Sequence, residues 1–256
     1  MKRKMKMKMK KRLLMVAILT SFSAPSVHAA VAEAPLHSAG AGELTISGTI
    51  VNSKTDWSWE IPAASAAATV DWDVDKREGV IDGNNTVYDF TSKGTITGLN
   101  GVMVEPSPKA RLGILPVIEI GGQKLGNVQS VGSEEYNLKL PVKGDNNTSG
   151  FLEMSATIYT AATARGGNNQ TFVANNGADN SARSLLKKQP YYSTTYTSPH
   201  DEPIAPAMWE VLTNTSFAQV SAAVSIELEQ FKLIFATNSQ PSSTWAASLP
   251  IVVTVI

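Results

Sequence analysis

Apolar and polar residues alternate in short segments along most of the chain. The clearest case is the segment 43–51, where Leu44, Ile46 and Ile50 share one row, Gly48 completes it, and threonine and serine fill the positions between. Successive side chains of a β-strand point to opposite faces, so a period of two predicts a strand with one buried face.

The same alternation recurs between clusters of glycine, asparagine and aspartate, such as those at 82–85, 144–147 and 166–169, which favour turns. Further strands are predicted at 56–61, 69–75, 86–90, 94–97, 111–120, 126–131, 136–142, 151–161, 220–228, 231–236 and 245–256. Many short strands with frequent turns predict an antiparallel sandwich or barrel, and strands do not alternate with helices as a parallel sheet requires. The predicted fold class is all-β.

Helical patterns are confined to 181–188, which Pro190 ends, and to 205–212. Both segments fall within 166–216, a stretch rich in asparagine, serine, threonine and tyrosine. We interpret this stretch as a loop and short-helix insertion on one domain, because all-β domains of about 200 residues are common.

Residues 1–29 have the pattern of a secretory signal peptide. Eight lysines and arginines lie within residues 1–12 without an acid, an apolar run follows at 13–22, and the segment ends at Ala29. A membrane-spanning helix needs about 20 apolar residues, more than this run has. We expect export and cleavage after Ala29 or Ala30; the alternative is a basic amphipathic helix on a cytosolic protein.

The net charge of zero conceals two unlike parts. Across 256 residues, 22 lysines and arginines balance 22 acids, but without residues 1–29 the chain has 14 basic and 22 acidic side chains, a net charge of −8. Basic side chains supply most nucleic-acid affinity, so nucleic acid is not an expected partner. The chain has no cysteine, which excludes disulfides, a thiolate nucleophile and cysteine-ligated metals.

Residues suited to catalysis or metal binding are few. Beyond the signal the histidines are His37 and His200, and no Gly-x-Ser-x-Gly motif supplies a nucleophile. Acids at 71, 73 and 75 resemble the start of a calcium loop, but Lys76 and Asp82 stand where that loop needs glycine and glutamate. We expect no enzyme, no metal and no cofactor; the alternative is a secreted hydrolase with His200 as general base.

The two ends of the exported chain carry complementary features. The segment 245–256 is a strongly β-prone strand with no polar tail, and such an edge aggregates unless it is paired. The segment 43–51, preceded by a small and polar arm at 30–42, has the pattern of a strand that is donated to the open edge of another molecule. Alternatively, both are the ordinary first and last strands of one sandwich.

These ends resemble the K88 (F4) fimbrial subunits of enteric bacteria. Residues 243–254 share a Trp-x-Ala-x-Leu motif followed by alternating Val/Ile and Thr, and near the other end Gly48-Thr49-Ile50 is followed by a polar turn and by Trp57-Ser58-Trp59. The absence of cysteine also agrees with this family. The chain departs from it in ending at Val255-Ile256, where family members commonly end in aromatic residues.

The resemblance implies an incomplete immunoglobulin-like β-sandwich at 52–256, completed by a strand that the arm at 30–51 of another subunit donates. The implied donor row is Leu44, Ile46, Gly48 and Ile50. The implied groove strand, which a chaperone would engage, carries Ile251, Val253 and Val255. The implied function is that of a structural, minor subunit of a surface fimbrium that contributes to adhesion to host cells. Its implied partners are neighbouring subunits, a periplasmic chaperone and an outer-membrane usher, met during export through the periplasm to the cell surface.

The resemblance leaves a second function open, that of an adhesin that itself binds a host glycan. The insertion carries aromatic and amide side chains of the kind that sugar sites use. They are Asn168, Asn169, Tyr191, Tyr192, Tyr196 and Trp209.

Overall fold

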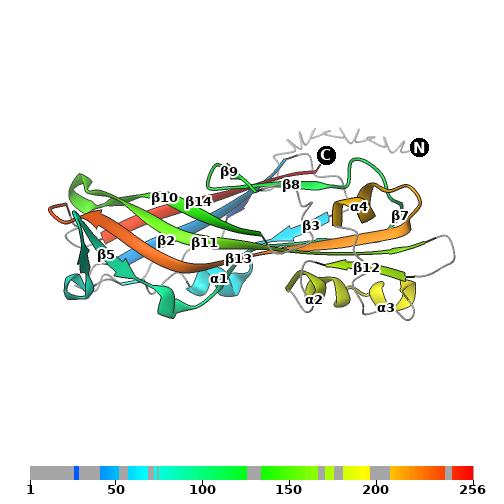
Figure 1. The fold of residues 1–256 in the computed structure, drawn as a ribbon, viewed down its shortest axis with the longest axis horizontal. Coiled ribbons are helices and arrows are strands. Elements are labelled where there is room, and N and C mark those ends of the chain that lie inside the picture. Colours follow the sequence, from blue (N-terminus) through cyan, green and yellow to red (C-terminus); the bar gives the residue numbers. More distant parts are fainter. Residues whose placement is uncertain are drawn as a thin grey trace, which may run out of the picture.

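The fold is an elongated, mostly antiparallel β-structure with a few short helices (Figure 1). A computed structural model describes residues 26–28, 41–51, 57–68, 72–73, 75–125, 134–166, 171–175, 181–196, 208–239 and 244–255. The strands are β1 (Ser26–His28), β2 (Ala41–Val51), β3 (Trp57–Glu60), β4 (Val80–Asp82), β5 (Asn85–Asp89), β6 (Ile96–Met103), β7 (Ser107–Lys109), β8 (Pro116–Ile120), β9 (Gln123–Lys124), β10 (Glu134–Gly144), β11 (Ser149–Arg165), β12 (Thr171–Asn175), β13 (Ala218–Ala236) and β14 (Thr244–Val255). The helices are α1 (Ala63–Ala68), α2 (Ser181–Lys187), α3 (Tyr192–Thr195) and α4 (Met208–Thr213). The all-β prediction is confirmed.

The strands form one continuous sheet with the order β1-β2-β14-β10-β11-β13-β5-β4 along its main path. The long strands β11 and β13 lie at its centre, and the second edge of β13 pairs in turn with β7, β6 and β5. Strand β14 pairs with β2 on one edge and with β10 and β8 on the other. Among the ladders of the described residues, β2 with β14 is the parallel one, and the others are antiparallel.

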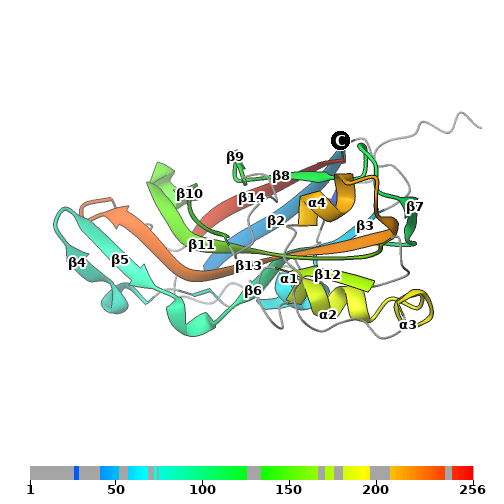
Figure 2. The ribbon, with the colours of Figure 1, turned by 45° about the vertical axis from the view of Figure 1, so that its right-hand side comes forward.

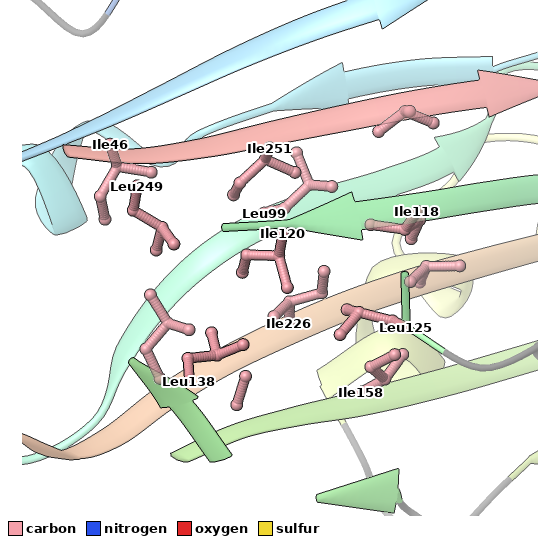
Figure 3. Packing of buried hydrophobic residues seen from close by; sticks show 14 of the residues in the cluster. Ile46, Leu99, Ile118, Ile120, Leu125, Leu138, Ile158, Ile226, Leu249 and Ile251 are labelled. Atoms are coloured by element: carbon pink, nitrogen blue, oxygen red, sulfur yellow. The ribbon is translucent and has the colours of Figure 1, made fainter. Parts of the chain in front are cut away.

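The sheet folds over itself and encloses one main core. Ile46 of β2 and Leu249 of β14 belong to the same buried cluster as Leu99 of β6 and Ile226 of β13, although β2 does not pair with either of those strands. Figure 3 shows these side chains pointing toward one another from the two layers. Burial of such side chains removes apolar surface from water, which is the main force that holds the two layers together.

A β-bulge explains why two strands predicted from sequence are one. Residues 220–228 and 231–236 were expected as separate strands, but both belong to β13. Glu229 pairs with Ser155 and Lys232 with Glu153, so β13 has one residue more than β11 between these pairs. Gln230 takes a positive φ of 57° at this point. The extra residue shifts the alternation of buried positions by one, and the apolar pattern therefore breaks in mid-strand.

A pair of tryptophans anchors β3 to the core. The rings of Trp57 and Trp59 stack with centroids 5.0 Å apart. The indole nitrogen Nε1 of Trp57 donates a hydrogen bond of 2.8 Å to the carbonyl oxygen of Ile114. Trp59 pairs across the ladder with Gly101 of β6, and its ring lies where a side chain at Gly101 would project.

The insertion packs on one end of the long central strands. Helix α2 forms where the helical pattern predicted it, and helices α2 and α3 lie beside β12 in both ribbon views (Figures 1 and 2). A second, smaller core joins Ala182 and Leu186 of α2 to Ala161 of β11 and Ala223 of β13. The insertion is therefore attached to the sandwich by buried apolar contacts.

The structure differs from the predicted elements in other places as well, among them the unpredicted short strands β4, β7, β9 and β12, the last of which lies inside the insertion. Trp72 is buried and Asp73 exposed, as alternation at 69–75 requires, yet neither belongs to a strand. The strand expected at 111–120 begins only at Pro116, after Gly113, whose φ is 91°. Helix α1 was not expected, although its sequence is almost all alanine, the best helix former. The predicted strand at 126–131 lies outside the described residues.

We predict that Gly101→Ala destabilises the domain by about 1–3 kcal/mol, because an added Cβ would lie 2.0 Å from Cζ3 of Trp59. Gly48→Ala is the matched control: its Cβ would meet only Cδ1 of Ile61 at 3.5 Å, an ordinary contact. Urea unfolding of the two variants measures the difference. Equal stability of Gly101→Ala and the parent chain would contradict this account of the tryptophan pair.

Candidate functional site

The candidate site is the buried row of β14 together with the edge along which β2 pairs, which we call the groove. Side chains of β14 alternate between buried and exposed, as its sequence predicted. The predicted groove residues Ile251, Val253 and Val255 are 1%, 2% and 0% exposed. On the β8 side they pair with Ile120, Ile118 and Pro116, respectively.

Strand β2 occupies the other edge of β14 within the same chain. It runs parallel to β14 over its whole length, from Ala41 beside Thr244 to Val51 beside Thr254. The two strands lie side by side in both ribbon views, β2 in blue and β14 in red (Figures 1 and 2). In this chain, therefore, the predicted donor strand and the predicted groove strand are paired with each other.

The predicted donor row fills the groove unevenly. Leu44 and Ile46 are 1% and 3% exposed, beside Ala247 and Leu249 of β14. Ile46 and Leu249 lie next to each other in Figure 3. Sequence reasoning placed the groove only at 251–255, and it missed Ala247 and Leu249, although both belong to the same alternating row.

The second half of the row is less complete. Gly48 has no side chain, and Ile50 is only partly buried beside the core. A pocket opens to solvent here, between β2 and β3. Its lining is Gly48, Thr49, Ile50, Trp59, Glu60, Ile61, Leu99, Ile251 and Val253. The end of β2 that leads into β3 is thus held by fewer buried contacts than its beginning.

The outer edge of β2 carries β1 over a short distance. Ser26, Val27 and His28 pair antiparallel with Thr49, Gly48 and Ser47, in that order. Strand β1 lies inside the predicted signal peptide.

The tyrosines proposed for a glycan site are packed inside the protein. Tyr192 is 8% and Tyr196 2% exposed, and their rings contact each other with centroids 5.4 Å apart. The hydroxyl of Tyr196 donates to the carbonyl oxygen of Gln219 and bonds Oγ of Ser221 at 2.8 Å. In this conformation the Tyr192 and Tyr196 rings hold the insertion on β13 and are not open to a sugar.

The other two aromatic candidates are partly accessible. Tyr191 is half-buried, and its hydroxyl donates to the carbonyl oxygen of Met103 at 2.7 Å. Trp209 is half-buried on α4. Asn168 and Asn169 lie outside the described residues. The sugar-binding alternative stays a prediction, and each of its four aromatic candidates is partly or fully buried.

Residues suited to catalysis or metal binding do not gather in the described part of the chain. Asp75 caps the short helix at 76–78 through the backbone N–H of Arg77, and its carboxylate pairs with the Arg77 guanidinium at 2.5 Å. This hydrogen bonding lowers the pKa of Asp75 to about 2. The described residues contain no group of three or more metal-ligating side chains, and His37, Asp71 and His200 lie outside them.

Among the described residues, no helix is both long enough and apolar enough to span a bilayer.

Comparison with known proteins decides the family. A family profile described as "Fimbrial, major and minor subunit", that of the K88 fimbriae, matches residues 9–227. The chain belongs to this family. Its members are structural subunits rather than enzymes, and they associate with other fimbrial subunits at the cell surface. No curated protein matches the chain.

The matched region of this K88-family subunit includes β2 and most of the sandwich but ends within β13. Strand β14, whose sequence carried half of the original resemblance, lies beyond it. The assignment to the family therefore stands independently of the C-terminal motif.

We predict that Ile46→Ala lowers the free energy of unfolding by about 2–5 kcal/mol, because it removes a fully buried side chain from the groove. Ser248→Ala, an exposed position on β14 beside the same ladder, is expected to change it by less than about 0.5 kcal/mol. Denaturant titration of the isolated chain measures both. Equal stability of the two variants would mean that β2 does not pack in the groove of its own chain.

We also predict that stability falls in strong base. Burial raises the pKa of Tyr191 from 10.0 to about 12 and raises that of Tyr196 as well. Because the pKa of Tyr191 is higher in the folded state than its ordinary value of 10.0, its neutral hydroxyl stabilises the fold fully below pH 10. This stabilisation is lost as the pH rises from 10 through about 12. Thermal unfolding between pH 9 and 12 measures the effect, and Tyr191→Phe should make the decline shallower. An equal decline in Tyr191→Phe would show that Tyr191 does not contribute.

Proposed function

We propose that this protein is a minor structural subunit of a bacterial fimbrium and that it assembles by strand donation, contributing in this way to adhesion to host cells. The observation that carries the proposal is the relation of β2 to β14. Strand β2 lies along the buried row of β14 in a parallel ladder, and the chain leads from its end to β3. Such a strand is separable, because main-chain pairing and alternate side chains are all that hold it.

The apolar groove itself supports the need for a second partner. If β2 leaves, Leu249, Ile251 and Val253 lose their cover along one edge, and an uncovered apolar strand edge aggregates. A subunit that donates its arm elsewhere therefore needs another strand in its own groove at every stage. We propose that a periplasmic chaperone supplies this strand first and that a neighbouring subunit supplies it at an outer-membrane usher.

The test is a chain in which residues 30–51 are deleted. We expect it to bind the chaperone, because the groove along β14 remains, and to form no fibres, because it has no strand to donate. A second variant keeps the arm at full length and replaces both Leu44 and Ile46 by Asn, which removes the apolar row without shortening the chain. Co-expression with chaperone and usher, followed by electron microscopy and co-purification, gives both readouts. Unimpaired fibre formation by either variant contradicts strand donation.

A further inference from the structure

The parallel pairing of β2 and β14 has a consequence for when the groove can be used. Each stretch of a strand edge can pair with only one other strand at a time, and β2 covers this edge of β14 in an unbroken register from Thr244 to Thr254. While β2 is in place, neither a strand from another subunit nor a strand from a different protein can pair at this edge. The chain thus blocks the site that its assembly requires.

The position of β3 permits β2 to pair within its own chain only in the parallel direction. Trp57, the first residue of β3, is hydrogen bonded to Ile114, two residues before the β8 segment that pairs with the end of β14. Val51 at the end of β2 lies beside Thr254, near the same end. The connection between β2 and β3 therefore joins two points at the C-terminal end of β14.

Reversal of β2 would move Val51 to the other end of β14, beside Thr244. The ten steps between Thr244 and Thr254 span about 33 Å at the usual rise of a strand. The six steps from Val51 to Trp57 reach at most about 22 Å when fully extended. A strand from another molecule has no such tether and is not bound to this direction.

The short tether also gives the internal strand an advantage in concentration. A strand joined to its site by a few residues competes as if it were present at an effective concentration on the order of millimolar. Its hold is nevertheless limited, since parallel pairing is slightly less stable per residue than antiparallel pairing. In addition, the half of the row at Gly48 and Ile50 fills its part of the groove incompletely.

We propose that β2 is an autoinhibitory cap: in the isolated subunit it closes the subunit's own groove in the parallel register, and assembly begins only when it is released. The cap protects the apolar edge of β14 and delays premature polymerisation of free subunits. This inference rests on the proposed function for its consequence in assembly, but the cap itself is tested separately.

Two cysteines test the cap, since the natural chain has none. Thr45 and Ser248 are register partners on the face opposite the groove row. Adjacent strands lie about 4.8 Å apart, within the Cα separation that a disulfide bridges. In the chain 30–256, purified without other fimbrial proteins, Thr45→Cys with Ser248→Cys is expected to oxidise to an intramolecular disulfide, seen by mass and by mobility on a non-reducing gel.

The matched control is Thr49→Cys with Ser248→Cys. Thr49 pairs with Val252, four residues from Ser248, so its Cα lies about 13 Å away, too far for a disulfide. The reversed register centred on the Ser47–Pro250 pair would bring Thr49 beside Ser248 instead. Cross-linking of this control pair as fast as the Thr45–Ser248 pair overturns the parallel cap.

The second readout is uptake of a fluorescent synthetic peptide with the sequence of residues 41–51. We expect the reduced Thr45→Cys/Ser248→Cys protein to take it up over time, and the oxidised protein to take it up at least about tenfold more slowly. Measurable uptake at the same rate by the two forms shows that β2 does not block the groove and overturns the proposal. If the disulfide forms but the reduced protein neither accepts the peptide nor polymerises, the proposed strand donation is wrong. The parallel pairing of β2 with β14 is still supported in that case.

Discussion

The fold depends on a strand that covers the edge of β14 away from β8 and β10. The buried row of β14 faces the core of the sandwich, and its edge away from β8 and β10 would be uncovered if β2 were absent. Leu44 and Ile46 close this edge with two fully buried side chains. A long apolar strand with an open edge is a site of aggregation, so the covering strand is a condition of solubility as well as of stability. The strand that meets this condition in the isolated chain is the one that we propose joins subunits in a fibre.

The connectivity of the chain then determines how the condition is met. Because β3 is anchored by Trp57 near the end of β14, the preceding strand reaches the groove only in the parallel direction. The tryptophan pair, the close approach of Trp59 to Gly101 and the pairing of β2 therefore belong to one arrangement. The pocket between β2 and β3 lies where this arrangement leaves the row incomplete at Gly48.

Period-two alternation predicted the fold class and most strands, because each strand has one face in the core. It failed where a local irregularity changes the period: the bulge at Gln230 divided β13 in the sequence pattern, and the positive φ of Gly113 delays the start of β8. Alternation also identified Leu44 and Ile46 as buried, together with the groove residues of β14. It could not say which strand pairs with which, because pairing depends on contacts between residues about 200 positions apart, and both alternatives remained open.

The aromatic residues of the insertion show a different limit. Tyrosine suits a sugar site and a protein core equally well, since it has an apolar ring and a polar hydroxyl. The sequence carries no signal that separates the two roles. In the structure Tyr196 uses its hydroxyl on Gln219 and Ser221, and the small residues Ala161, Ala182 and Ala223 make room for the ring cluster beside it.

Hydrogen exchange of the isolated chain 30–256, resolved to single amides, measures whether β2 covers the edge of β14. In a parallel edge strand every second residue directs its N–H toward its partner, while the others face away. If β2 is paired, we expect alternate amides between Leu44 and Ile50 to exchange as slowly as the amides of β14 beside them, and the amides between them to exchange fast. Fast exchange throughout 44–50, with β14 still protected, would show that β2 does not cover the groove in the isolated chain.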